Sequence, residues 1–204
     1  MRIPTAFMLA ALLVACGGAP SPARHAHAHG AHGGSETTAA FRAHHAEIRT
    51  ALDEAASRAM ALSSASPEQA GELMHGIVHF FVHELMPHAE AEERVLYSAA
   101  DRLVPTAHGR RYTDALRYEH TVVAREVRAL HEAMESGERS PEALADFQRR
   151  TLELVGLVKA HFGAEEDVVL AAFDELMSPE DFQREVVEPM HGAEGGAPEH
   201  HHAH

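Results

Sequence analysis

Residues 152–176 read LELVGLVKAHFGAEEDVVLAAFDEL and indicate most clearly how the chain folds. Apolar residues recur every three or four positions, which is the spacing of one face of an α-helix. His161 and Glu165 lie four residues apart within that apolar face. The stretch therefore predicts a long helix that points a histidine and a glutamate toward a protein core.

The composition favours a helical protein. The chain has 204 residues and contains no tryptophan. Ala, Leu, Val, Glu and Arg are abundant and runs of β-branched residues are short, so we expect an all-α fold with one domain and extra segments at its ends. The formal net charge of -14 argues against a nucleic-acid partner, because such a protein would not neutralise phosphates.

Local signals mark where the helices begin and end. Ser-Pro-Glu occurs at 66–68, 140–142 and 178–180, and each places a serine cap before a first-turn proline and an acid. Gly137 is a typical helix stop, Pro105 ends the helix before it, and Pro189 is expected to end the last helix. Pro87 is expected to kink its helix. The predicted helices are residues 36–62, 67–103, 109–136, 141–177 and 179–188.

The order of these helices suggests an internal repeat. A medium helix followed by a long one that begins with Ser-Pro-Glu occurs twice. Two such pairs would encode a four-helix bundle with approximate two-fold symmetry. The segment 179–188 would be a short additional helix at the C-terminal end.

Each of the four long helices is predicted to carry one histidine on its apolar face. The second and fourth helices add a glutamate one turn later, at Glu92 after His88 and at Glu165 after His161. Buried carboxylates cost several kcal/mol unless a positive charge compensates, and an i, i+4 pair can bind one ion together. The mixed nitrogen and oxygen set suits iron, manganese or zinc. The alternative is that these are core histidines with ordinary hydrogen bonds. The predicted inward positions on the second and fourth helices are Ile77, Phe81, His88, Glu92, Val95 and Ala99, and Leu154, Leu157, His161, Glu165, Val168, Ala172 and Leu176.

Four stretches resemble the ligand-bearing segments of the hemerythrin-like, or HHE cation-binding, family. They are His45-Ala-Glu-Ile-Arg, His88-Ala-Glu-Ala-Glu-Glu-Arg-Val-Leu-Tyr, Glu119-His120 and His161-Phe-Gly-Ala-Glu-Glu-Asp-Val-Val-Leu, and the resemblance covers about residues 40–177. It implies an up-down-up-down four-helix bundle around two carboxylate-bridged iron ions, with manganese or zinc as alternatives. The implied terminal ligands are His45, His88, His120 and His161, and the implied bridging ligands are Glu92 and Glu165.

Two departures from the family pattern bear on function. Oxygen-carrying hemerythrins have a further histidine where this chain has Ala124, and an aspartate five residues after the last histidine, whereas Glu165 follows His161 at four. The set is more similar to di-iron proteins that repair iron–sulfur clusters and to iron-sensing domains of the family. The resemblance implies a protein that binds or reacts with oxygen, nitric oxide or peroxide, and it leaves an enzymatic role open. The alternatives are iron storage, sensing or metal handling, and a structural bundle with a vestigial site.

The N-terminal residues 1–16, MRIPTAFMLAALLVAC, have the layout of a secretory signal. Leu13-Val14-Ala15-Cys16 followed by Gly17 resembles a bacterial lipobox. The resemblance implies lipidation of Cys16 and anchoring in the cell envelope, on the periplasmic face of an outer membrane. The alternative is an ordinary signal peptide.

The remaining segments are rich in histidine. Residues 17–35 are expected to form a flexible tether, residues 36–188 the domain, and residues 189–204 a disordered tail. The histidines of the tails either collect metal loosely or reflect composition alone. His75, His79 and His83 recur every fourth residue and are expected to face solvent, where a second metal site or a simple polar face are the alternatives. Glu84 is expected to lean inward, as a further ligand or a hydrogen-bond acceptor for a ligand imidazole.

Overall fold

The structure is a computed structural model, and it describes residues 37–106 and 108–194. Of these residues 87% are helical and none lies in a strand, which confirms the all-α class. The predictions for the signal, for Cys16 and the tether, and for the tail beyond residue 194 lie outside the described residues. Within the described ranges, the helices and the wider or tighter turns that join them combine into five helical rods.

The rods follow one another along the chain. The first is α1 (Ala39–Ala61), which ends in a short 3-10 turn. The second joins α2 (Pro67–Phe80), α3 (Met86–Ala91) and α4 (Tyr97–Leu103) through π-helical turns at Phe81–Leu85 and Glu92–Leu96. The third is α5 (Asp114–Glu135). The fourth joins α6 (Pro141–Ala164) to α7 (Ala171–Leu176) through the π-helical turn Glu165–Leu170. The fifth joins α8 (Pro179–Phe182) to α9 (Glu188–Glu194) through the π-helical turn Gln183–Val187.

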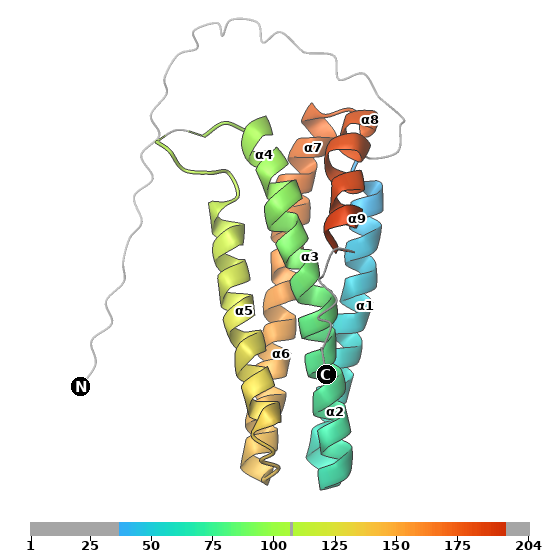
Figure 1. Cartoon of the computed structure of the whole chain (residues 1–204), viewed down its shortest axis with the longest axis vertical. Helices are drawn as coiled ribbons and strands as arrows, with labels where there is room; N and C mark the ends of the chain where they lie inside the picture. Colours follow the sequence, from blue (N-terminus) through green and yellow to red (C-terminus); the bar gives the residue numbers. More distant parts are fainter. Residues whose placement is uncertain (1–36, 107, 195–204) are drawn as a thin grey trace, which may run out of the picture. The chain divides into compact units, whose positions relative to one another are not determined.

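The four long rods lie side by side, and consecutive rods run in opposite directions (Figure 1). The first rod packs against α2 and α6, and α5 packs against the same two helices. The short fifth rod lies along α3 near the end of the molecule where α4 and α7 finish. This arrangement turns one face of each long rod toward a shared interior.

The serine caps confirm the predicted helix starts. The Ser66 hydroxyl accepts a hydrogen bond from the backbone N–H of Gln69, and the Gln69 side chain accepts one from the backbone N–H of Ser66. Ser140 and Ser178 cap α6 and α8 in the same way, through their side chains. Gly137 follows the C-cap residue of α5, Ser136, and adopts a φ of 70°, as a helix stop requires.

The predicted start of the third long helix, at residue 109, is wrong. The helix begins at Asp114. His108 and Gly109 have φ values of 64° and 70°, which a right-handed helix excludes. Thr113 then precedes the first turn, and its N–H and hydroxyl both donate to the carboxylate of Asp101.

The prediction that Pro189 ends the last helix is also wrong. The helix continues to Glu194, and Met190 is buried. Pro189 follows the π-helical turn Gln183–Val187, just as Pro87 follows the one at Phe81–Leu85. Proline has no N–H and its ring crowds the preceding turn. A wider turn at that point relieves both problems, so the distortion expected at Pro87 takes this form.

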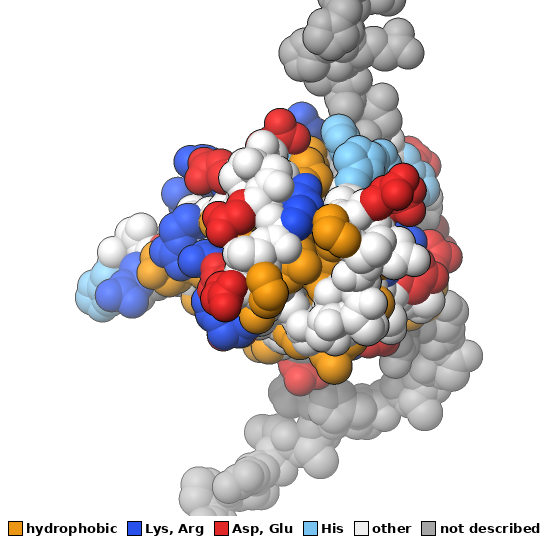
Figure 2. All heavy atoms as spheres, turned by 90° about the horizontal axis from the view of Figure 1, so that it is seen from below, with side chains coloured by type: hydrophobic (Ala, Val, Ile, Leu, Met, Phe, Trp, Pro, Cys, Tyr) orange, Lys and Arg blue, Asp and Glu red, His pale blue; other side chains and the backbone are white. Residues whose placement is uncertain are grey.

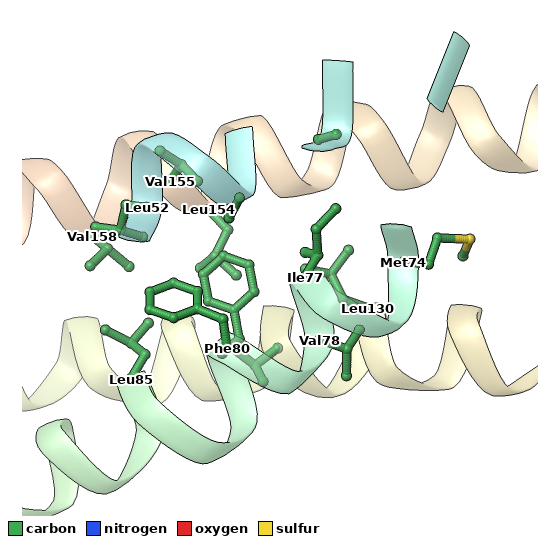
Figure 3. Packing of buried hydrophobic residues seen from close by; sticks show 14 of the residues in the cluster. Leu52, Met74, Ile77, Val78, Phe80, Leu85, Leu130, Leu154, Val155 and Val158 are labelled. Carbon is green, nitrogen blue, oxygen red and sulfur yellow. The ribbon is translucent and has the colours of Figure 1, made fainter. Parts of the chain in front are cut away.

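The buried apolar residues form two clusters. One lies toward the end where α2 begins and includes Leu52, Ile77, Leu130 and Leu154, which point toward one another from four rods (Figure 3). The other lies toward the opposite end and includes Phe41, Tyr97, Leu170, Phe173 and Phe182. Along the second and fourth rods, buried histidines and glutamates come between residues of the two clusters.

Candidate metal centre

The structure brings together all six residues that the sequence predicts as ligands. They come from the four long rods, and each is buried although its side chain is polar. Glu92 and Glu165 have no exposed surface at all. The six are His45 on α1, His88 on α3, Glu92 in the following π-helical turn, His120 on α5, His161 on α6 and Glu165 in the π-helical turn after it.

A π-helical turn begins at each of the two glutamates. The wider turn rotates all later residues around the helix axis. Some of the residues that are predicted to face inward after each glutamate therefore do not. Val168 and Leu176 are 47% and 57% exposed, and Val95 is half-buried. The residues buried in their place are Leu96, Val169, Leu170 and Phe173. Such turns often occur at functional sites.

Two groups of potential metal ligands share Glu92. The first group is His45, His88 and Glu92, and the second is Glu92, His120 and His161. Glu92 Oε1 lies 2.8 Å from His88 Nε2 and 3.2 Å from His45 Nε2. Its other oxygen, Oε2, lies 3.4 Å from His120 Nε2. One carboxylate thus offers one oxygen to each group, which is the position of a bridging ligand.

Glu165 belongs to neither group, although it contacts a residue of the first. Glu165 Oε2 lies 3.4 Å from His45 Nε2. The Nε2 atoms of His120 and His161 lie only 3.0 Å apart. Two ring nitrogens at that separation cannot both carry a hydrogen, and two imidazoles that ligate one ion converge in this way. The geometry therefore fits a metal ion between the rings.

Three glutamates orient the histidines from outside. The Nδ1 atoms of His45, His120 and His161 lie 3.0, 3.1 and 2.8 Å from carboxylate oxygens of Glu166, Glu93 and Glu119 respectively. A hydrogen on each Nδ1 leaves Nε2 with a lone pair that points inward. Carboxylate partners of this kind fix the tautomer and raise the basicity of a metal-bound imidazole.

Sequence reasoning missed these three glutamates, although a signal was present. Each is the direct neighbour of a predicted ligand or of its bridging glutamate: Glu93 follows Glu92, Glu119 precedes His120, and Glu166 follows Glu165. Arg49 Nη1 also lies 2.6 Å from the Glu166 carboxylate. Burial alone would raise the pKa of Glu166, but Arg49 and His45 hold it below its usual range. Glu166 is therefore an anion that can accept from His45.

An approximate two-fold symmetry relates the hydrogen bonds and ion pairs at the N-terminal ends of α1 and α5. Thr38 precedes α1, and its N–H and hydroxyl both donate to Asp174, which also pairs with Arg42. Thr113 precedes α5, and its N–H and hydroxyl donate to Asp101, which also pairs with Arg117. The two guanidinium groups in turn donate to the backbone carbonyls of Glu166 and Glu93. The predicted internal repeat thus has matching contacts on both sides of the centre.

The two buried carboxyl groups have opposite electrostatics. Burial alone would raise the pKa of Glu92, but the charge of His88 and the nearby ring nitrogens of His120, His45 and His88 hold it well below its usual range. Burial and the neighbouring charge of Glu92 raise the pKa of Glu165 well above its usual range. In the absence of metal, these opposite shifts favour an ionised Glu92 beside a protonated Glu165.

Tyr97 is a second feature that sequence reasoning missed. Its side chain is fully buried, and its hydroxyl lies 3.2 Å from His161 Nε2 and 3.4 Å from His120 Nε2. Burial and the nearby carboxyl groups of Glu165 and Glu92 raise its pKa, so the phenol keeps its proton. Burial and the charge of His120 lower the pKa of His161, which favours the neutral ring that a metal requires.

Three buried oxygens have no hydrogen-bond donor: Oε2 of Glu92 and both oxygens of Glu165. Leaving a buried carboxylate in this state costs several kcal/mol. Imidazole nitrogen and carboxylate oxygen are the ligand types that iron, manganese and zinc accept. The buried groups could therefore hold a metal ion, which would satisfy the three oxygens.

Glu84 lies outside this arrangement. Its side chain is exposed, and neither group of potential ligands among the described residues includes it. The π-helical turn Phe81–Leu85 contains Glu84 and changes its register relative to His88. The expectation that it leans into the centre is therefore wrong.

Comparisons with known proteins do not place the chain in a family. No helix among residues 37–106 and 108–194 is long and apolar enough to cross a bilayer. No protein-family model, curated protein or solved structure matches the chain.

Proposed function

We propose that the chain is a hemerythrin-like di-iron protein that binds or reacts with oxygen, nitric oxide or peroxide. In this proposal the four long rods form an up-down-up-down four-helix bundle around the metal ions. The observation that carries it is the pair of buried ligand groups joined by Glu92, together with three carboxylate oxygens that lack donors. A structural bundle with a vestigial site would have no reason to bury these oxygens.

The ligands divide between two ions. His45 and His88 would hold one, His120 and His161 the other, and Glu92 would bind both. The position of Glu165 Oε2, 3.4 Å from His45 Nε2, supports a role as the second bridging ligand once its proton has left. Iron supplies one-electron chemistry and coordination positions that protein ligands do not fill, where a small diatomic ligand or peroxide can bind.

The protein's own side chains set the conditions at that position. The Tyr97 hydroxyl lies beside the His120 and His161 nitrogens and can donate a hydrogen bond to a ligand on that side. The rings of Phe41 and Phe162 lie against His45, at 4.9 and 4.2 Å between centroids. These apolar walls limit water near the centre, which strengthens electrostatic interactions within it.

The test is titration of the iron(II)-loaded full chain with nitric oxide under anaerobic conditions. We expect new visible absorption and an electron paramagnetic resonance signal that saturate with the iron content. Glu92→Ala should lose both the iron and the signal, while Glu175→Ala, at an exposed glutamate on α7, should keep them. The proposal would be ruled out if the spectrum of the iron-loaded protein did not change on addition of oxygen, nitric oxide or peroxide.

Iron storage, sensing or metal handling is the second candidate. The exposed histidines His75, His79 and His83 favour it, because they offer surface sites for metal ions. This function predicts that iron loading depends on surface histidines and that gases leave the spectrum unchanged. The same nitric oxide titration therefore separates the two candidates.

We also propose that the protein is held at a membrane surface in a bacterial cell envelope, on the periplasmic face of an outer membrane. The support is the sequence Leu13-Val14-Ala15-Cys16 after a short apolar run. Two or three acyl chains give stable anchoring. The test is labelling of expressing cells with palmitate, which should mark the wild-type chain and not Cys16→Ser. Equal labelling of both chains would rule out this anchor.

A further inference from the structure

A row of histidines runs along the outer side of α2 and the π-helical turn after it. His75, His79 and His83 are all exposed, as predicted. Their ring centroids are 6.1 Å apart between the first pair and 4.7 Å between the second. Figure 2 shows exposed histidine side chains gathered on one side of the molecule next to acidic side chains.

The spacing of the row suits metal chelation. Side chains four residues apart on a helix lie above one another on the same face, and imidazole is a common ligand of divalent transition metals. The row makes ring contacts within itself, and no described carboxylate forms an ion pair with any of its members. The His79 and His83 rings are therefore placed to share one ion.

The row borders a groove between the first and second rods, here called the α1–α2 groove. One part is a cavity of about 420 Å³ lined by residues that include His75, His79, Glu54 and Glu84, with Arg58 beside Glu54. The next part is a cavity of about 300 Å³ lined by residues that include His83, Glu84, His44, Glu47 and His88. Glu84 lines both parts, so they are neighbours.

The inner end of the α1–α2 groove reaches the candidate metal centre. His88 lines the groove although its side chain is 2% exposed, and its Nε2 lies 2.8 Å from Glu92. The His44 ring also lines the groove, at 4.9 Å from the His88 ring. A continuous series of imidazole and carboxylate groups thus runs from solvent to a buried ligand.

On the symmetry-related side, the described residues at the matching positions are different. Glu84 and His83 lie four and five residues before His88. The residues four and five positions before His161 are Leu157 and Gly156, which have no metal-binding group. The residue next to His120 in the position of His44 is Glu119, and it accepts from His161 Nδ1. Both halves of the repeat therefore carry ligand histidines, whereas the polar residues of the α1–α2 groove occur in only one half of the described bundle.

We propose that the α1–α2 groove is the route by which metal enters the centre, with His79 and His83 as its outer binding site for a divalent transition metal ion. Glu84 and His44 then lie along the path of that ion to His88. This inference rests on the proposed metal-binding function. It adds a site and a direction of loading that the centre alone does not imply.

The experiment follows the uptake of iron(II) by the metal-free full chain under anaerobic conditions. His79→Gln/His83→Gln is compared with wild type and with His131→Gln, which changes an exposed histidine on α5. Circular dichroism checks that helix content is equal. Because the row concentrates ions at the entrance, we expect the double variant to load on the order of tenfold more slowly. Its final iron content should equal that of wild type, and His131→Gln should match wild type in both.

The outcomes separate the two proposals. Equal loading rates in wild type and the double variant, with normal final iron content, would overturn the entry route and leave the metal centre standing. A wild-type chain that binds no iron at Glu92 and His161 after full equilibration would overturn the proposed function and the route with it. Equilibrium dialysis with zinc on the iron-loaded chain gives a second readout, in which the double variant should bind about one ion fewer than wild type. Equal zinc binding would overturn the outer site.

Discussion

Replacing Glu165 with glutamine should stabilise the metal-free protein and weaken metal binding. Glu165 is fully buried and neither of its oxygens receives a hydrogen bond. The pKa of Glu165 is raised well above its usual range, so folding near neutral pH takes up a proton that the unfolded chain does not hold. Glutamine keeps the shape of the side chain and is uncharged in the folded and unfolded states, so the variant folds without taking up that proton.

Because one pKa unit corresponds to about 1.4 kcal/mol, the expected gain in free energy of unfolding is about 1–3 kcal/mol without metal. For a domain of this size, that gain corresponds to an increase of about 3–10 °C in the midpoint of thermal unfolding. With iron(II) in excess, wild type should become more stable than Glu165→Gln. A ligand at a thousand times its dissociation constant adds about 4 kcal/mol to wild type, and the variant has lost one of the ligands.

The assay is thermal unfolding followed by circular dichroism, with and without iron(II), under anaerobic conditions. Glu175→Gln is the matched control, because it makes the same chemical change at an exposed position in the same rod. It should leave both midpoints close to wild type. A Glu165→Gln protein that is less stable than wild type without metal, or that gains as much from iron as wild type does, would refute the reasoning.

Three further predictions concern the groups around the centre. Glu119→Gln should lower iron affinity about 10- to 100-fold, because the His161 imidazole loses its carboxylate partner; competition with a chelator measures this, and an unchanged affinity would contradict it. Tyr97→Phe should keep the iron content but shift the near-ultraviolet spectrum and cost about 1 kcal/mol in affinity for a ligand on that side; identical gas titrations would show that the hydroxyl plays no part. Metal affinity should rise with pH until it passes the raised pKa of Glu165, since the proton must leave before the carboxylate binds; calorimetry in two buffers should count its release, and Glu165→Gln should release fewer protons.

Local chemistry made the helices predictable. The Ser-Pro-Glu starts at 66–68, 140–142 and 178–180 and the stop at Gly137 depend on neighbouring residues alone, and the structure places helix ends at each of them. Prolines were harder to interpret. A proline inside a helix can be accommodated by a wider turn before it, and the sequence of Gln183–Val187 carries no separate signal for that turn.

The candidate site was predictable where ligands follow helical periodicity and unpredictable where the helix departs from it. His161 and Glu165 at i, i+4 share a face in any regular helix, so their convergence could be expected. The π-helical turn that begins at Glu165 moves all later residues around the axis, which buries Val169 and exposes Val168. Tyr97 reaches the centre through the equivalent shift after Glu92, and a regular helix would not have placed it there.

Metal content tests the central claim most directly. The full chain is purified without nickel resin, loaded with iron(II), exposed to air and analysed for iron and for near-ultraviolet absorption. We expect wild type to bind about two more iron ions per chain than Glu92→Ala or His161→Ala. It should also show an absorption band that both variants lack. Equal iron in wild type and variants, a single zinc, or no bound metal in a folded protein would contradict the di-iron centre.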